Sequence, residues 1–261
     1  MAGMSPRLVM GYRRRQLLLS TRLVRQIMQA WRELANPAQI DTSWPILRSV
    51  LTQPVLRARE ESARLAADFY LEARREAGFD ADGFSPSKPT PLTVERLNST
   101  LDVTGPVEFK KAIASGKTPP QALDQAAVRM AGSTQYAALE GGRSVIRDSI
   151  ERDDRATGYA RVTDNDPCAW CAMLASRGPV YKSAKTAGDP RQGGDRYHDL
   201  CGCQAVPSFT LDEPFIGIAD KLYEDWRRET KGHGGKHAVN AFRRWWEAEG
   251  RNAYAPTASP P

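Results

Sequence analysis

The sequence has few cysteines and histidines and no long apolar run. Its 261 residues include only four cysteines and three histidines, and no hydrophobic stretch approaches the roughly 20 residues that span a bilayer. The lack of a long apolar run excludes a membrane-spanning protein, and we expect no membrane partner. The low number of cysteines excludes a secreted scaffold braced by disulfides. Because 41% of the residues are hydrophobic and 26% are charged, the composition predicts a globular chain and not a disordered one.

Acidic residues are absent from the first 32 positions, where arginine is frequent. Arginine side chains can neutralise phosphates without reading base sequence. The candidates for such non-specific contact with double-stranded DNA are Arg13, Arg14, Arg15, Arg22 and Arg25. The alternative interpretation is an ordinary solvated helix face.

The same segment does not predict a secretory signal peptide. Thr21 and Arg22 interrupt the apolar stretch too early, and no small-residue cleavage site follows it. We therefore expect the thiols to lie in a reducing cytoplasm, where clustered cysteines bind metal more often than they form disulfides.

The pattern of the chain predicts a mainly α fold with a small α+β lobe held by zinc. Apolar residues recur at helical spacing through the first segment. We expect Pro54 to kink or divide a helix over residues 43–76, and Gly141-Gly142 to interrupt a helix that begins near Thr118. The predicted divisions are an N-terminal helical segment (1–78), a helical middle (79–154), a Cys/His lobe (155–210), and C-terminal helices with a flexible tail from Ala255 (211–261).

All four cysteines fall between positions 168 and 203. Cys168-x-x-Cys171 is followed, after an interval, by His198-x-x-Cys201-x-Cys203, and two such knuckles have the spacing of a structural zinc site. Two short turns of this kind can bring four ligands to the corners of a tetrahedron. Gly202 permits the sharp turn that the second knuckle needs.

Five side chains compete for four ligand positions. Our first choice is the set Cys168, Cys171, His198 and Cys201, because residues three apart can share one face of a turn. The alternative set replaces His198 with Cys203. A redox-active or structural disulfide is the other interpretation of the cluster.

The region around the knuckles resembles a known family signature. The stretch from Gly158 to Tyr181, with its Asp-rich turn before Cys168, and the stretch from Tyr197 to Cys203 are similar to phage minor head proteins of the MuF-like, head-morphogenesis family. The similarity covers residues 158–209. The half of the chain before residue 158 agrees with that family only in its general helical pattern.

The ending departs from the common pattern of that family. Members often carry Pro-Asn-Cys-Arg-Cys after the histidine, where this chain has Asp199-Leu200-Cys201-Gly202-Cys203. The form present here resembles a variant of actinobacterial phages, some of which are labelled capsid maturation proteases.

The resemblance implies a structural minor capsid protein, located inside the phage head after assembly in the host cytoplasm. It implies association with the portal protein and the major capsid protein, and a role in assembly or in the fate of packaged DNA. The alternative function that it implies is a capsid maturation protease acting on head proteins.

The residues themselves favour a structural protein over an enzyme. A thiolate-rich zinc site is typically closed, whereas a catalytic zinc keeps an open position. The sequence has no H-E-x-x-H and no G-x-S-x-G motif. A Ser-Lys protease that uses Ser176 or Ser183 with Lys182 or Lys185 stays an alternative. The fold brings such a pair together, so its sequence spacing does not reveal it.

Overall fold

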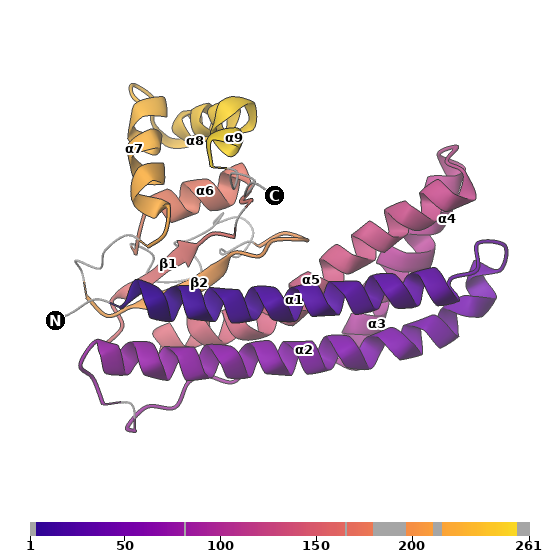
Figure 1. The fold of residues 1–261 in the computed structure, drawn as a ribbon, viewed down its shortest axis with the longest axis horizontal. Coiled ribbons are helices and arrows are strands. Elements are labelled where there is room, and N and C mark those ends of the chain that lie inside the picture. The colour runs from indigo at the N-terminus through magenta and orange to yellow at the C-terminus, as the bar shows by residue number, and fades with distance from the viewer. Residues whose placement is uncertain (1–3, 81, 165, 180–196, 211–215, 255–261) are drawn as a thin grey trace, which may run out of the picture.

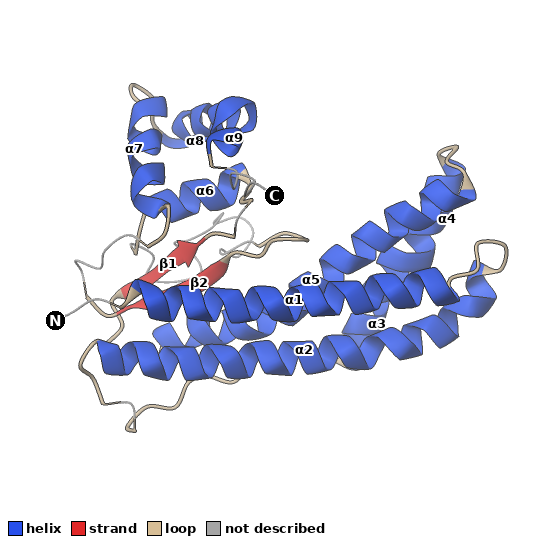
Figure 2. Ribbon diagram, in the orientation of Figure 1, coloured by secondary structure: helices blue, strands red, loops and turns tan. Residues whose placement is uncertain are grey.

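A computed structural model describes residues 4–80, 82–164, 166–179, 197–210 and 216–254. The described part is mainly helical with one two-stranded sheet (Figure 2), as the sequence predicts. The helical elements are α1 (Pro6–Leu34), α2 (Ile40–Glu76), α3 (Val94–Asp102), η1 (Val103–Val107), α4 (Glu108–Ala114), α5 (Pro119–Ile150), α6 (Ala169–Ser176), α7 (Ala219–Glu229), α8 (Gly235–Trp245), η3 (Trp246–Gly250) and α9 (Arg251–Ala253). The strands are β1 (Gly158–Val162) and β2 (Gln204–Ser208).

Three long helices form the body of the molecule. α1, α2 and α5 lie side by side (Figure 1), and α2 packs against both of the others. The ring of Tyr12 on α1 stacks on Phe69 of α2, with centroids 4.2 Å apart. Helix α5 therefore shares a core with the N-terminal helices, and the first two predicted segments contribute to one bundle.

The expected interruption at Gly141-Gly142 is wrong, because α5 runs unbroken from Pro119 to Ile150. These glycines lie where α5 crosses α2. A Cβ at Gly141 would lie 2.4 Å from the carbonyl oxygen of Arg59, and one at Gly142 would lie 2.7 Å from that of Ser62. The glycines therefore permit the close approach of two helices and do not end either.

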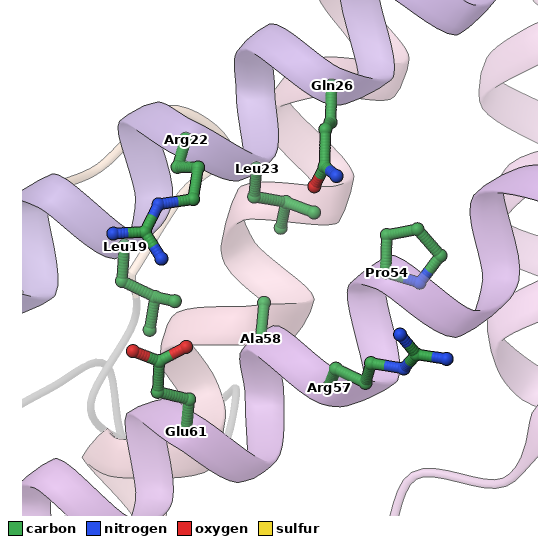
Figure 3. A pocket seen from close by; sticks show the side chains of 8 residues that line it. All are labelled: Leu19, Arg22, Leu23, Gln26, Pro54, Arg57, Ala58 and Glu61. Carbon is green, nitrogen blue, oxygen red and sulfur yellow. The ribbon is translucent and has the colours of Figure 1, made fainter.

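Of the two outcomes expected at Pro54, a division of the helix is also wrong, whereas a kink there stays a prediction. Helix α2 continues through Pro45 and Pro54, and its packing against α1 and α5 outweighs the backbone hydrogen bond that each proline cannot donate. Beside Pro54 the groove between α1 and α2 opens into a hollow of about 190 Å³ (Figure 3). It is lined by Leu19, Arg22, Leu23, Gln26, Pro54, Arg57, Ala58 and Glu61.

The small sheet lies between this bundle and the C-terminal helices (Figure 1). β1 and β2 pair antiparallel, with Gly158 opposite Ser208 and Val162 opposite Gln204. The C-terminal helices pack on α6, and the indole Nε1 of Trp246 donates to the carbonyl oxygen of Pro167 at 3.1 Å. The sheet and the C-terminal helices therefore enclose the segment that carries the first cysteine pair.

None of the helices in the described ranges combines the length and the hydropathy that a membrane span requires. The predicted tail, residues 255–261, lies outside the described residues.

Candidate metal centre

The first knuckle is built on the start of α6. Cys168 is the residue that caps this helix, and its Sγ accepts a hydrogen bond from the backbone N–H of Cys171 at 3.4 Å. This turn places both thiols at the positive end of α6, where the helix dipole favours a thiolate. Cys171 is fully buried, whereas Cys168 is partly exposed.

The second knuckle leads directly into β2. Its turn places Leu200 in the left-handed region with a φ of 66°, and the chain then enters the strand after Cys203. Gly202 has a different purpose from the one expected. A Cβ there would lie 2.9 Å from Oδ2 of Asp164, and the Gly202 N–H donates to that oxygen at 2.7 Å. The glycine is needed for close approach and not for a positive φ.

The two knuckles meet at Cys171. The ligand atoms of Cys168, Cys171 and His198 lie within 4.8 Å of one another, and the same is true of the sulfurs of Cys171, Cys201 and Cys203. The structure therefore brings all five predicted ligands together across an interval of 26 residues between Cys171 and His198.

The sulfur geometry matches ligands and not a bonded disulfide. Sγ of Cys171 lies 3.6 Å from Sγ of Cys201, and all four cysteines are free thiols. Two thiolates on a tetrahedral zinc, each about 2.3 Å from the ion, lie roughly 3.8 Å apart. A disulfide would require about 2.05 Å.

The ring of His198 is oriented by its backbone. Its Nδ1 lies 2.7 Å from the carbonyl oxygen of Asp199. Because a carbonyl can only accept, Nδ1 carries a proton, and Nε2 is the nitrogen that would bind a metal after it loses its own proton.

The crowding of the sulfurs favours one anion at the centre. The hydrogen bond with Cys168 raises the pKa of Cys171, but bonds from Cys201 and Cys203 outweigh it and lower that pKa to about 5. A hydrogen bond with Cys171 raises the pKa of His198 to about 9. Without metal the pair is therefore a thiolate beside an imidazolium, and an incoming cation would displace the imidazolium proton.

Two buried arginines stand beside the thiols. Arg161 of β1 donates to Sγ of Cys171 at 3.5 Å. Arg143 of α5 donates to the carbonyl oxygens of Cys201 and Cys203 at 2.6 and 2.9 Å. Arg143 is 0% exposed and Arg161 is 2% exposed. Buried cations require nearby negative charge, so this pair matches a cluster that carries thiolate charge.

The ring of Tyr197 separates these two arginines. The Cζ atoms of Arg143 and Arg161 lie 3.7 and 4.0 Å from its centroid. The sequence alone does not identify these three residues, because nothing in their local pattern distinguishes them from solvated side chains.

The donor set fits zinc. Soft thiolates with one imidazole select this ion among common divalent metals, and the burial of Cys171, Cys201 and Cys203 gives a closed site. Cys171 belongs to both groups of potential ligands. The choice between His198 and Cys203 as the fourth ligand stays a prediction.

The predicted DNA-contacting arginines lie on α1. Arg14, Arg15, Arg22 and Arg25 are exposed. Arg13 differs, since it is half-buried and lines a cavity of about 280 Å³ together with Asp164.

The protease candidates lie in unfavourable or undescribed places. Ser176 is 0% exposed, and its hydroxyl donates to the carbonyl oxygen of Met173, so it cannot attack a substrate from this position. Lys182, Ser183 and Lys185 lie outside the described residues.

The fold and the site together define a mainly helical protein with a Cys/His lobe that could hold a metal ion. Comparison with known proteins gives a family as well. The profile described as VG15 protein matches residues 4–229, and the chain belongs to this family.

Two curated relatives are similar to the chain over most of its length. Gene 15 protein of Mycobacterium phage D29 is 32% identical over 220 residues, which cover 73% of this chain and 76% of the relative. Gene 15 protein of Mycobacterium phage L5 is 25% identical over 216 residues, which cover 67% and 69%. No solved structure gives a significant match. The chain is thus a phage protein of the gene 15 type.

Proposed function

We propose that this chain is a structural minor head protein of a tailed phage, in which a zinc ion holds the Cys/His lobe together. The observation that carries the proposal is the meeting of the two knuckles at Cys171, within the region that resembles MuF-like head proteins. The relatives with phage names support the same setting.

The character of the site supports a structural role. Three of the five candidate ligands are almost wholly buried, which leaves little room for a substrate at an ion placed among them. Two arginines hold the backbone and the sulfurs of the cluster. An ion bound there would hold two distant chain segments together and would have no open position for catalysis.

The attachment of the Cys/His lobe to the helical bundle also supports a structural role. The second knuckle lies against α5, where a Cβ at Gly132 would come within 2.9 Å of Cβ of Asp199. With Arg143 holding the same knuckle from α5, the metal lobe and the long bundle share an interface. Such a body can present separate surfaces to the portal protein and the major capsid protein.

The test is made in the phage that encodes the chain. A nonsense codon in its gene should yield few or aberrant heads in a non-suppressing host, and quantitative mass spectrometry should find the protein in purified wild-type heads. Normal heads without the protein would contradict the proposal. Co-expression with the major capsid protein should leave the latter full-length, whereas specific trimming would support the alternative of a capsid maturation protease.

A further inference from the structure

Helix α1 has two chemically different faces. Toward α2 and α5 it buries an apolar face that includes Tyr12, Leu23 and Ile27. Burial of this face is sufficient to hold the helix on the bundle. The opposite face makes no contribution to that core and is exposed at Arg7, Arg14, Arg25 and Arg32.

Four arginines follow one line along that outer face. Arg7, Arg14, Arg25 and Arg32 are all exposed, and they are separated by seven, eleven and seven residues. With 3.6 residues in each turn, these intervals are close to two, three and two whole turns, and the line is roughly 38 Å long. We refer to these four residues as the arginine line.

Within the described residues, the arginine line has no partner in the protein. In the described part of the chain its four side chains make no ion pair, hydrogen bond or ring contact. By contrast, the exposed residues Arg64 and Arg251 elsewhere each pair with an aspartate. Four unpaired like charges on one helix repel one another, so their arrangement favours an external anion.

Acidic side chains lie at the border of this face and not along it. Glu33 follows the last arginine. Glu61 of α2 lines the hollow beside Arg22, with Arg57 on the same groove (Figure 3). Arg22 therefore has a carboxylate nearby. Glu33 lines a hollow together with Arg25 and Arg32, but in the described part of the chain it forms no ion pair with either arginine.

We propose that the arginine line binds the phosphate backbone of double-stranded DNA without reading its sequence. Duplex DNA offers a phosphate every few ångströms over any length, so it can supply partners to a straight row of charges. Guanidinium groups suit phosphate oxygens because their donors form a planar fork. An acidic protein would instead need carboxylates placed at the same intervals as the four arginines. The inference does not depend on the proposed head function.

The experiment measures binding of the full-length protein to duplexes of unrelated sequence by fluorescence anisotropy over a series of salt concentrations. The variant R7Q/R14Q/R25Q/R32Q removes the arginine line. The matched control K111Q/K117Q/K231Q/R244Q removes equal charge from exposed positions elsewhere. Circular dichroism melting verifies that both variants remain folded.

We expect equal affinity for different sequences and a steep loss of affinity with salt. In R7Q/R14Q/R25Q/R32Q, a plot of the logarithm of the association constant against the logarithm of the salt concentration should become less steep. Its slope should decrease in magnitude by roughly 3 to 4, at about 0.9 for each phosphate that the variant no longer neutralises. The control should keep the wild-type slope. The proposal would be overturned by equal slopes in the two variants or by absence of binding at low salt. It would also be overturned if polyglutamate competed as strongly as DNA, because that result would assign the face to an acidic protein.

Discussion

The guanidinium Nη2 of Arg143 lies 2.6 Å from the carbonyl oxygen of Cys201. The same group also binds the carbonyl oxygen of Cys203, and its side chain is completely buried. One side chain of the bundle therefore satisfies the backbone of both cysteines in the second knuckle. The Cys/His lobe is therefore joined to α5 by buried hydrogen bonds from the Arg143 guanidinium.

Replacement of Arg143 should separate the lobe from the bundle. Arg143→Met leaves two buried carbonyl groups without a donor and removes a cation beside the thiols, so we expect a loss of about 3 kcal/mol in the free energy of unfolding. Denaturant titration measures it. Arg129→Gln on the same helix is the control, because this exposed side chain makes only a 4.0 Å ion pair, and it should cost less than about 0.5 kcal/mol. Equal losses in the two variants would contradict the assigned role of Arg143.

The identity of the fourth ligand can be decided by two single substitutions. If the set is Cys168, Cys171, His198 and Cys201, then Cys203→Ser should retain one zinc per chain and His198→Ala should lose affinity by at least tenfold. Elemental analysis of protein purified without chelator gives the stoichiometry, and competition with a chromogenic chelator gives the affinity. The reverse result would assign the position to Cys203. Zinc-free wild-type protein with freely titrating thiols would remove the metal site altogether.

Removal of zinc should loosen the lobe while the bundle persists. The stacked rings of Tyr12 and Phe69 and the rest of the core between α1, α2 and α5 do not involve the cysteines, whereas the knuckles depend on their common ion. After chelation we expect faster amide exchange in residues 197–210 and unchanged protection in α2. Hydrogen exchange with mass spectrometry measures both segments in one sample. Uniform deprotection would show that the metal supports the entire fold.

The helix crossing gives a prediction that does not involve the metal. Gly141→Ala should push α5 away from α2, because the new Cβ would meet the carbonyl oxygen of Arg59 at 2.4 Å. We expect a loss of about 2 kcal/mol or more, visible as a lower melting temperature. Gly11→Ala in α1 is the control. No atom lies within 4 Å of that added Cβ, so helix propensity should stabilise the variant by roughly 0.5 to 1 kcal/mol. A destabilised control would indicate that α1 is constrained in some other way.

Local patterns in the sequence predicted the helices and the cysteine cluster. The helical spacing of Leu19, Leu23 and Ile27 identifies the buried face of α1, and the two knuckles identify five ligands that the structure brings together. Zinc itself stays a prediction.

The errors arose where tertiary contacts determine the outcome. Pro54 and Gly141 break isolated helices, yet both lie within long helices that packing holds intact. Arg143 and Arg161 could not be assigned, because an arginine in a helix or strand is ordinarily solvated. Only the three-dimensional fold places them against thiols that come from other parts of the chain.

The pairing of β1 with β2 also holds the two knuckles near each other without an ion. These strands bracket both knuckles, with Val162 opposite Gln204 at the inner end, so backbone hydrogen bonds bring the two cysteine-bearing segments together independently of the cysteine side chains. The sheet therefore reduces the conformational entropy that an ion would otherwise have to overcome in joining the two knuckles.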